Sequence, residues 1–272
     1  MKKKSVVKNY IYNLIYQILV ILVPVITTPY LSRILGAENI GIYSYTISIT
    51  TYFVLFGSLG IATYGQREIA YHSNNEEKRT KTFVEIISLR IIFLIISLVV
   101  FYFSFCLDGK YHNYYKILIF EIIANSIDIS WFFQGIEEFK KIIVRNVFIK
   151  LIGVISIFVL IKTSEDLSIY YMIYVGANLL GNMSLWGYIL KYTKIEKIKL
   201  KELNIRRHIK PTISLFIPQV AIQIYTVLDK TMIGMMVEDK REVGYYEQAQ
   251  KIMKLLLAIV TSLRCCYEFK NS

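Results

Sequence analysis

The chain has 272 residues, of which 55% are hydrophobic and only 19% are charged, and its mean hydropathy is +0.46. A soluble domain carries about 25% charged residues and covers its surface with polar groups, so this composition excludes an ordinary soluble enzyme and indicates an all-α polytopic membrane protein. The net charge of +12 lies in the gaps between apolar segments, so we expect a lipid bilayer and no nucleic acid as the partner.

Eight apolar segments are long enough to cross about 30 Å of hydrocarbon as helices. In chain order they are Tyr10–Ser32, Ile40–Ala62, Phe83–Cys106, Tyr114–Gln134, Ile143–Thr163, Ser168–Leu190, Thr212–Met236 and Gly244–Leu263. The first is longer than the apolar part of a signal peptide and ends without a small-residue cleavage site, so we interpret it as a retained membrane helix.

The distribution of basic residues predicts the orientation of these spans. With residues 1–9 in the cytoplasm, the predicted inner segments up to residue 211 hold eighteen lysines and arginines, and the outer segments together with the adjoining span ends hold six. Because basic residues are enriched in cytoplasmic loops, we expect a multi-pass plasma membrane protein with a cytoplasmic N-terminus.

The chain divides after the sixth span. Residues 10–190 form a predicted first lobe of six helices, and residues 212–263 form the first two helices of a second lobe. The basic segment 191–211 between them is a cytoplasmic linker, which is either an amphipathic helix on the inner leaflet or a solvated loop.

A short internal repeat in the sequence supports this division. Val23-Pro24 in span one corresponds to Ile217-Pro218 in span seven, and Ile40-Gly41 at the start of span two corresponds to Val243-Gly244 at the start of span eight. Six spans separate the copies, so both run the same way across the membrane, as in the parallel repeats of some secondary transporters.

Polar residues recur on one face of several spans, at intervals of three and four residues. Span seven carries Gln219, Gln223, Thr226 and Lys230, with Asp229 beside them and Pro218 at their entry. Span eight carries Glu247, Lys251 and Lys254, and span four carries Glu121, Asn125 and Asp128. Span one carries Asn13 and Gln17, followed by Pro24, Thr27 and Thr28. Polar groups in hydrocarbon are costly, so these stripes predict a shared wet cavity.

Lys230, Lys251, Lys254, Gln219, Gln223 and Asp229 are the candidate binding residues, and such a cationic cavity suits an anionic substrate such as a diphosphate. Asp128, Asn125, Glu121, Pro24 and Pro218 are candidate gating or coupling residues. The alternative is that Asp229–Lys251 or Lys230–Glu247 are ion pairs that only hold the bundle together.

Other polar and aromatic residues have simpler interpretations. Arg90 and Lys150 are expected to extend toward the membrane interface, and Trp131-Phe132-Phe133 is expected to form part of an interfacial aromatic belt. His72, His112 and His208 lie in separate predicted loops, so we expect neither a metal site nor a cofactor. No nucleotide-binding motif is present, so transport would depend on a gradient of H⁺, Na⁺ or the substrate.

Several ordered blocks resemble one known family. They are ITTPYLSRILG (residues 26–36), IGIYSY (40–45), GQREIA (65–70), WFFQGIEEF (131–139), VLDKTMIG (227–234) and EVGYYEQAQK (242–251). Together they are similar to Wzx-type (RfbX-like) polysaccharide repeat-unit flippases of the multidrug/oligosaccharidyl-lipid/polysaccharide exporter superfamily.

This resemblance implies two six-helix lobes around a cationic central cavity that works by alternating access. It implies that undecaprenyl-diphosphate-linked oligosaccharide is carried from the inner to the outer leaflet of the bacterial plasma membrane for O-antigen or capsule synthesis. Other polysaccharide assembly proteins are further expected partners. The alternatives are a related drug or lipid exporter, or a membrane glycosyltransferase or polymerase, which the short outer loops disfavour.

Family members have about twelve or more spans, whereas eight are predicted here. Residues 264–272 (RCCYEFKNS) are abruptly polar and unlike the family's continuation. We therefore expect a truncated chain with an aberrant tail produced by a frameshift, which would be an inactive remnant by itself.

Overall fold

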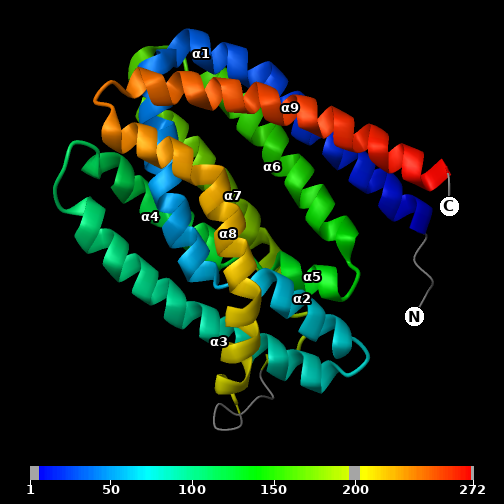
Figure 1. Cartoon of the computed structure of the whole chain (residues 1–272). Coiled ribbons are helices and arrows are strands. Elements are labelled where there is room, and N and C mark those ends of the chain that lie inside the picture. Colours follow the sequence, from blue (N-terminus) through cyan, green and yellow to red (C-terminus); the bar gives the residue numbers. More distant parts are fainter. Residues whose placement is uncertain (1–5, 196–202, 271–272) are drawn as a thin grey trace.

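The structure is a computed structural model of the whole chain, and it describes the backbone of residues 6–195 and 203–270 and the side chains of residues 19–195 and 203–257. The fold is all-α (Figure 1). Its helices are α1 (Val6–Ser58), α2 (Ile61–Tyr71), α3 (Glu76–Phe101), α4 (His112–Ser126), α5 (Ser130–Gly135), α6 (Phe139–Leu160), α7 (Leu167–Ile189), α8 (Arg206–Met236) and α9 (Lys240–Lys270).

Five helical segments of the described chain are long and apolar enough to cross a membrane. They are Leu19–Tyr71, Glu76–Cys106, His112–Gly135, Phe139–Leu160 and Arg206–Met236. The first of them covers two predicted spans, and α7 and α9, which coincide with predicted spans six and eight, are not in this set.

The predicted loop between the first two spans is replaced by a kink at one residue. The helical backbone of α1 is interrupted at Gly36, which has φ of 76° and ψ of 169°. Glycine adopts positive φ at little cost because it has no Cβ atom. The chain can therefore change direction here without a separate loop, which the apolar pattern alone did not predict.

Predicted span four is also interrupted. α4 ends at Ser126 and α5 begins at Ser130, so the expected continuous helix Tyr114–Gln134 is broken at residues 127–129. In a membrane, such a break is tolerated where other groups satisfy the freed backbone carbonyls.

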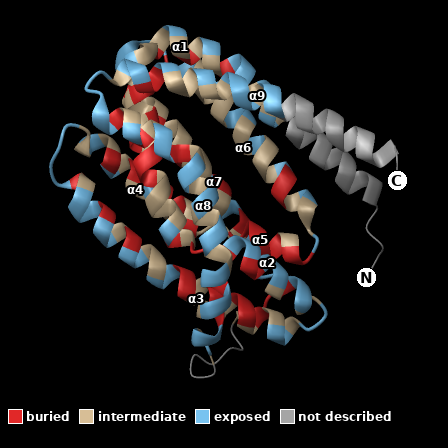
Figure 2. Ribbon diagram, viewed as in Figure 1, coloured by how far each residue is buried: buried red, intermediate tan, exposed pale blue. Residues whose placement is uncertain are grey.

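The aromatic run that opens α5 is part of the core and not of an interfacial belt. Trp131 is 1% exposed, and Phe132 and Phe133 are fully buried. Trp131 lies near Phe83 of α3, with ring centroids 5.7 Å apart. The expectation of an aromatic belt is therefore wrong, because the short helix α5 packs against α2 and its aromatic rings meet Phe83 of α3, which buries them (Figure 2).

Gly41 and Gly244, the two glycines of the predicted internal repeat, lie against each other in the structure. α9 lies alongside α1 (Figure 1), and the backbones approach most closely at Gly41 and Gly244. A Cβ atom on Gly41 would overlap the carbonyl oxygen of Lys240, and one on Gly244 would overlap that of Ala37. The contact is reciprocal, which is the geometry that two repeats facing each other would produce.

The turn between α6 and α7 is fixed by a capping box. The Asp166 carboxylate accepts hydrogen bonds from the backbone N–H groups of Lys162 and Thr163, each at 2.8 Å. These donors stabilise the ionised carboxylate and lower the pKa of Asp166.

The inner linker is shorter than expected. Residues 196–202, on which much of the predicted amphipathic helix falls, lie outside the described residues. α8 begins at Arg206, so the last six residues assigned to the linker form the first turns of this helix. His208 is buried there against Glu85 of α3 and Tyr64 of α2, and this contact fixes the start of α8 on the first lobe.

Candidate functional site

Two of the three candidate lysines surround one carboxylate between α8 and α9. Lys230 Nζ lies 2.9 Å from Glu247 Oε2, and Lys251 Nζ lies 3.6 Å from Glu247 Oε1. Ser44 of α1 donates a hydrogen bond to the same carboxylate at 2.7 Å. The structure thus contains the Lys230–Glu247 pair that was considered as an alternative, and a second lysine shares its carboxylate.

Lys254 completes this group, which we call the lysine cluster: Ser44, Lys230, Glu247, Lys251 and Lys254. The Lys254 ammonium donates a hydrogen bond to Gln250 Oε1 at 3.1 Å. It is close enough to Lys230 and Lys251 for electrostatic repulsion and to Glu247 for attraction. The cluster therefore combines three ammonium groups with one carboxylate.

The other candidate binding residues of α8 lie around the cluster with different partners. Asp229 accepts a hydrogen bond from the Tyr246 hydroxyl at 2.6 Å and makes no ion pair with Lys251 among the described contacts. Gln219 donates to Thr63 of α2 at 3.1 Å. Gln223 is half-buried and lies one turn before Thr226 in α8. The Thr226 hydroxyl donates a hydrogen bond to the Gln223 backbone carbonyl.

The polar stripe of span four lies elsewhere. Glu121 accepts hydrogen bonds from Asn125 at 2.8 Å and from Asn178 of α7 at 3.1 Å. The structure therefore packs this stripe inside the first lobe, between α4 and α7. The structure describes no direct contact between this stripe and the lysine cluster, and the side chains of Asn13 and Gln17 of span one lie outside the described residues.

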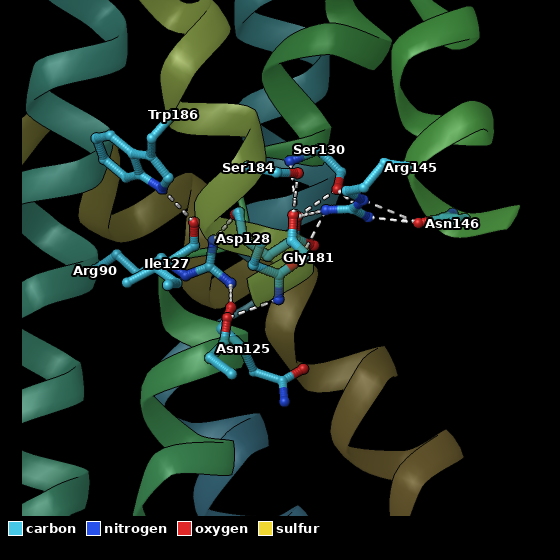
Figure 3. A network of polar contacts seen from close by, with 12 residues as sticks. Arg90, Asn125, Ile127, Asp128, Ser130, Arg145, Asn146, Gly181, Ser184 and Trp186 are labelled. Atoms are coloured by element: carbon cyan, nitrogen blue, oxygen red, sulfur yellow. Dashed lines mark hydrogen bonds and ion pairs between the residues drawn. The ribbon is translucent and has the colours of Figure 1, made fainter. Parts of the chain in front are cut away.

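Asp128 belongs to a further network at the break between α4 and α5 (Figure 3). Its carboxylate accepts the backbone N–H of Ser130 at 2.9 Å and lies 3.6 Å from the Arg145 guanidinium. Arg145 also donates to Asn182 at 2.8 Å and to Asn146 at 2.7 Å. α4, α5, α6 and α7 are thereby joined at this point.

The carbonyls freed by the break are satisfied by side chains from two other helices. Arg90 of α3 donates to the carbonyls of Asn125 at 2.6 Å and Asp128 at 2.5 Å. Trp186 of α7 donates to the carbonyl of Ile127 at 2.8 Å. Arg90 is 4% exposed, so the expectation that it extends to the interface is wrong. It stays in the core because the break leaves the Asp128 carbonyl without a helical donor and leaves the Asn125 carbonyl with only the Asp128 N–H, at 3.3 Å.

Substitution of Arg90 by leucine is therefore expected to lower the free energy of unfolding by about 2 kcal/mol, since the Asp128 carbonyl loses the Arg90 donor, the Asn125 carbonyl keeps only the Asp128 N–H, and a buried carbonyl left unsatisfied costs about 1–3 kcal/mol. Thermal melting of the detergent-solubilised protein measures this. Arg67→Leu, on the exposed face of α2, is the control and should change little. Equal melting of the Arg90→Leu variant and the wild type would contradict this role.

The two candidate gating prolines both lie inside long helices. Pro24 is in the first half of α1, and Pro218 is in α8, one residue before Gln219. Proline removes one helical hydrogen bond and weakens the helix locally, so both positions suit a bend. Lys150, expected to extend to the interface, lies half-buried in α6.

Sequence reasoning missed Ser44, Arg145 and Asn178. Each has another polar residue four positions away in its helix, namely Ser48, Lys141 and Asn182, a spacing that could have drawn attention to them. The useful signal was that polar residues in a membrane helix almost always find partners, but the partner of each is on another helix, so spacing along one helix could not identify it.

The comparisons with known proteins agree with this architecture. A family model described as "Polysaccharide biosynthesis protein" matches residues 6–264. Proteins named "Putative O-antigen transporter" are 26% identical over 265 residues in Escherichia coli (strain K12) and 25% identical over 224 residues in Shigella dysenteriae. The alignments cover 96% and 78% of this chain, and 63% and 54% of those proteins.

One solved structure, titled "protein A", has the same fold over 95% of this chain and 63% of its own length, with a TM-score of 0.65 and 16% identity. The chain thus spans about three fifths or less of the length of these relatives. Because the family model covers nearly all of its residues, the chain belongs to the polysaccharide biosynthesis protein family.

Proposed function

We propose that this chain is the first lobe and the beginning of the second lobe of a flippase for undecaprenyl-diphosphate-linked oligosaccharide. The lobes would move the repeat unit from the inner to the outer leaflet by alternating access, for O-antigen or capsule synthesis. The family membership and the names of the relatives support a transport role in polysaccharide synthesis. The distribution of basic residues supports a cytoplasmic N-terminus.

The lysine cluster is the observation that carries the proposal. Lys230 and Lys251 both pair with Glu247, and Lys254 lies near them, so three ammonium groups face one carboxylate and the cluster keeps a surplus of positive charge. Two unit charges 4 Å apart interact by about 4 kcal/mol at an effective dielectric constant of 20. A diphosphate entering here would meet Lys230, Lys251 and Lys254 and compete with Glu247 for their ammonium groups.

The competition also suggests how substrate could change the packing of the helices. Glu247 links α9 to α8 through Lys230 and to α1 through Ser44. A diphosphate that takes over Lys230 would weaken the first link and leave the second. The same event would therefore loosen α8 relative to α9 and α1, which is the kind of differential contact that alternating access requires.

We further propose Glu121, Asn125 and Asp128 as coupling residues for a cation, H⁺ or Na⁺, with Pro24 and Pro218 as bending points. Glu121 is buried, and its side-chain partners Asn125 and Asn178 are uncharged amides. A carboxyl group in this setting can take up and release a proton without breaking an ion pair with these two partners.

Binding of farnesyl diphosphate, a short analogue of the lipid carrier, to the detergent-solubilised protein tests the cluster. Lys230→Gln and Lys251→Gln are each expected to weaken binding about tenfold, since a hydrogen bond to a charged group contributes about 1.5–3 kcal/mol. Lys230→Arg should retain most of the affinity, and Lys78→Gln, an exposed residue of α3, is the control.

Two results would count against the proposal. If farnesol binds as tightly as farnesyl diphosphate, the cluster does not recognise the diphosphate, and a lipid exporter becomes the better interpretation. If the diphosphate binds but the natural gene fails to restore surface polysaccharide in a strain lacking its O-antigen transporter, the site stands and the assigned glycan is wrong.

A further inference from the structure

An apolar groove with a basic end lies between α6 and α7, apart from the lysine cluster. Its volume is about 860 Å³, within the range of about 300–1,000 Å³ typical of ligand sites. Lys140, Lys141 and Arg145 line one end, and Val144, Phe148 and Ile152 continue along α6. The opposite wall is formed by α7, including Leu180 and Gly187.

The basic end is held in place by the surrounding structure. The Lys141 ammonium donates to the Tyr192 hydroxyl at 2.5 Å and lies 4.0 Å above the centre of that ring. Arg145 is oriented by Asn182, Asn146 and the Asp128 carboxylate (Figure 3). Asp128 balances much of the Arg145 charge, so Lys140 and Lys141 supply most of the net positive charge at the groove.

The rest of the groove is mostly apolar, with Ser184 and Tyr188 as its other polar side chains. Phe148 is 64% exposed and Leu180 is 70% exposed. Side chains of this size on a membrane helix contact lipid or another apolar surface. About eleven residues separate Lys141 from Ile152, which corresponds to about 17 Å along the helix, close to half of the roughly 30 Å hydrocarbon thickness.

The placement of the basic end identifies the leaflet. Lys140 and Lys141 begin α6 on the side where the charge distribution puts the cytoplasm. We propose that the groove binds one anionic phospholipid of the inner leaflet, with its phosphate at Lys140, Lys141 and Arg145 and one acyl chain along Val144, Phe148 and Ile152. Basic pockets between membrane helices on the cytoplasmic side recognise anionic headgroups by this charge complementarity.

Native mass spectrometry of the detergent-solubilised full chain, titrated with phosphatidylglycerol, tests this proposal. Lys140→Gln is expected to weaken phosphatidylglycerol binding about fivefold, because one lysine or arginine near an anionic lipid surface contributes about 1 kcal/mol to binding. Lys78→Gln removes an exposed lysine of α3 that does not line the groove and should leave binding unchanged.

A second pair of variants tests the groove itself. A Cβ atom on Gly187 or Gly176 of α7 meets no heavy atom within 4 Å, but only Gly187 lines the groove. Gly187→Leu is therefore expected to displace the acyl chain and abolish saturable binding, while Gly176→Leu should bind as the wild type does. The Cβ atom added at either position meets open space, so we expect both variants to fold.

Headgroup comparisons separate the sources of phosphate. Phosphatidylglycerol should bind at least about fivefold more tightly than phosphatidylcholine with the same acyl chains, and glycerol phosphate should not compete. Equal binding of the two lipids, competition by glycerol phosphate, or unchanged binding by Gly187→Leu would each overturn the proposal.

Discussion

Replacing Gly41 by leucine is expected to destabilise the protein by about 3 kcal/mol or more, the upper end of the cost of overpacking a rigid site. A Cβ atom on Gly41 would occupy the position of the Lys240 carbonyl oxygen, which is backbone and cannot rotate away. α1 and α9 would have to separate along their contact. Gly244→Leu should have a similar effect, because its Cβ atom would meet the Ala37 carbonyl oxygen.

Thermal melting in detergent measures this effect, with Gly153→Leu as the matched control. Gly153 lies in the middle of α6, and a Cβ atom there meets no heavy atom within 4 Å. The control replaces a helical glycine by the same residue, so it separates helix propensity from the clash. If Gly41→Leu melts at the same temperature as Gly153→Leu, the close approach of α1 and α9 is not part of the folded state.

Replacing Glu85 by alanine is expected to cost about 3–5 kcal/mol, the usual effect of removing one partner from a buried ion pair. Glu85 is fully buried and accepts hydrogen bonds from His208 at 2.8 Å, Arg207 at 2.5 Å and the backbone N–H of Asn204 at 2.7 Å. Without the carboxylate, these donors at the start of α8 lose their common acceptor on α3.

Hydrogen exchange of residues 203–215 locates the effect, and thermal melting measures its size. In Glu85→Ala, exchange should accelerate first at this segment, because Glu85 is the acceptor that fixes it to the first lobe. Arg241→Ala removes an exposed ion pair with Asp239 at 4.0 Å and should change stability by less than about 1 kcal/mol. Uniform acceleration over all helices would show that Glu85 supports the whole core and not this junction.

The candidate site was predictable in composition but not in arrangement. The spacing of Lys230, Glu247 and Lys251 correctly indicated that polar residues of spans seven and eight belong together. The spacing could not show that the Glu121 stripe of span four lies apart from these residues. A stripe shows which face of a helix is polar and not which helix that face meets. Glu121 accepts a hydrogen bond from Asn178 of α7, a helix whose polar residues were not among the predicted site residues.

The predictions for Arg90 and Trp131 were wrong for one shared reason. Both were interpreted by general preferences of their side chains for a membrane interface. The break at residues 127–129 overrides these preferences, because it frees carbonyls that Arg90 must satisfy and starts the short helix that buries Trp131. The segment is apolar throughout, so hydropathy alone did not reveal the break.

The sequence by itself determined that the chain is an all-α protein of apolar helices and predicted that Gly41 and Gly244 correspond, because hydropathy and local motifs are properties of contiguous residues. Only the tertiary structure decided that these two glycines touch, that Glu247 is shared by two lysines, and that α6 and α7 leave a groove. These contacts join residues far apart in the chain, and their geometry depends on how whole helices pack.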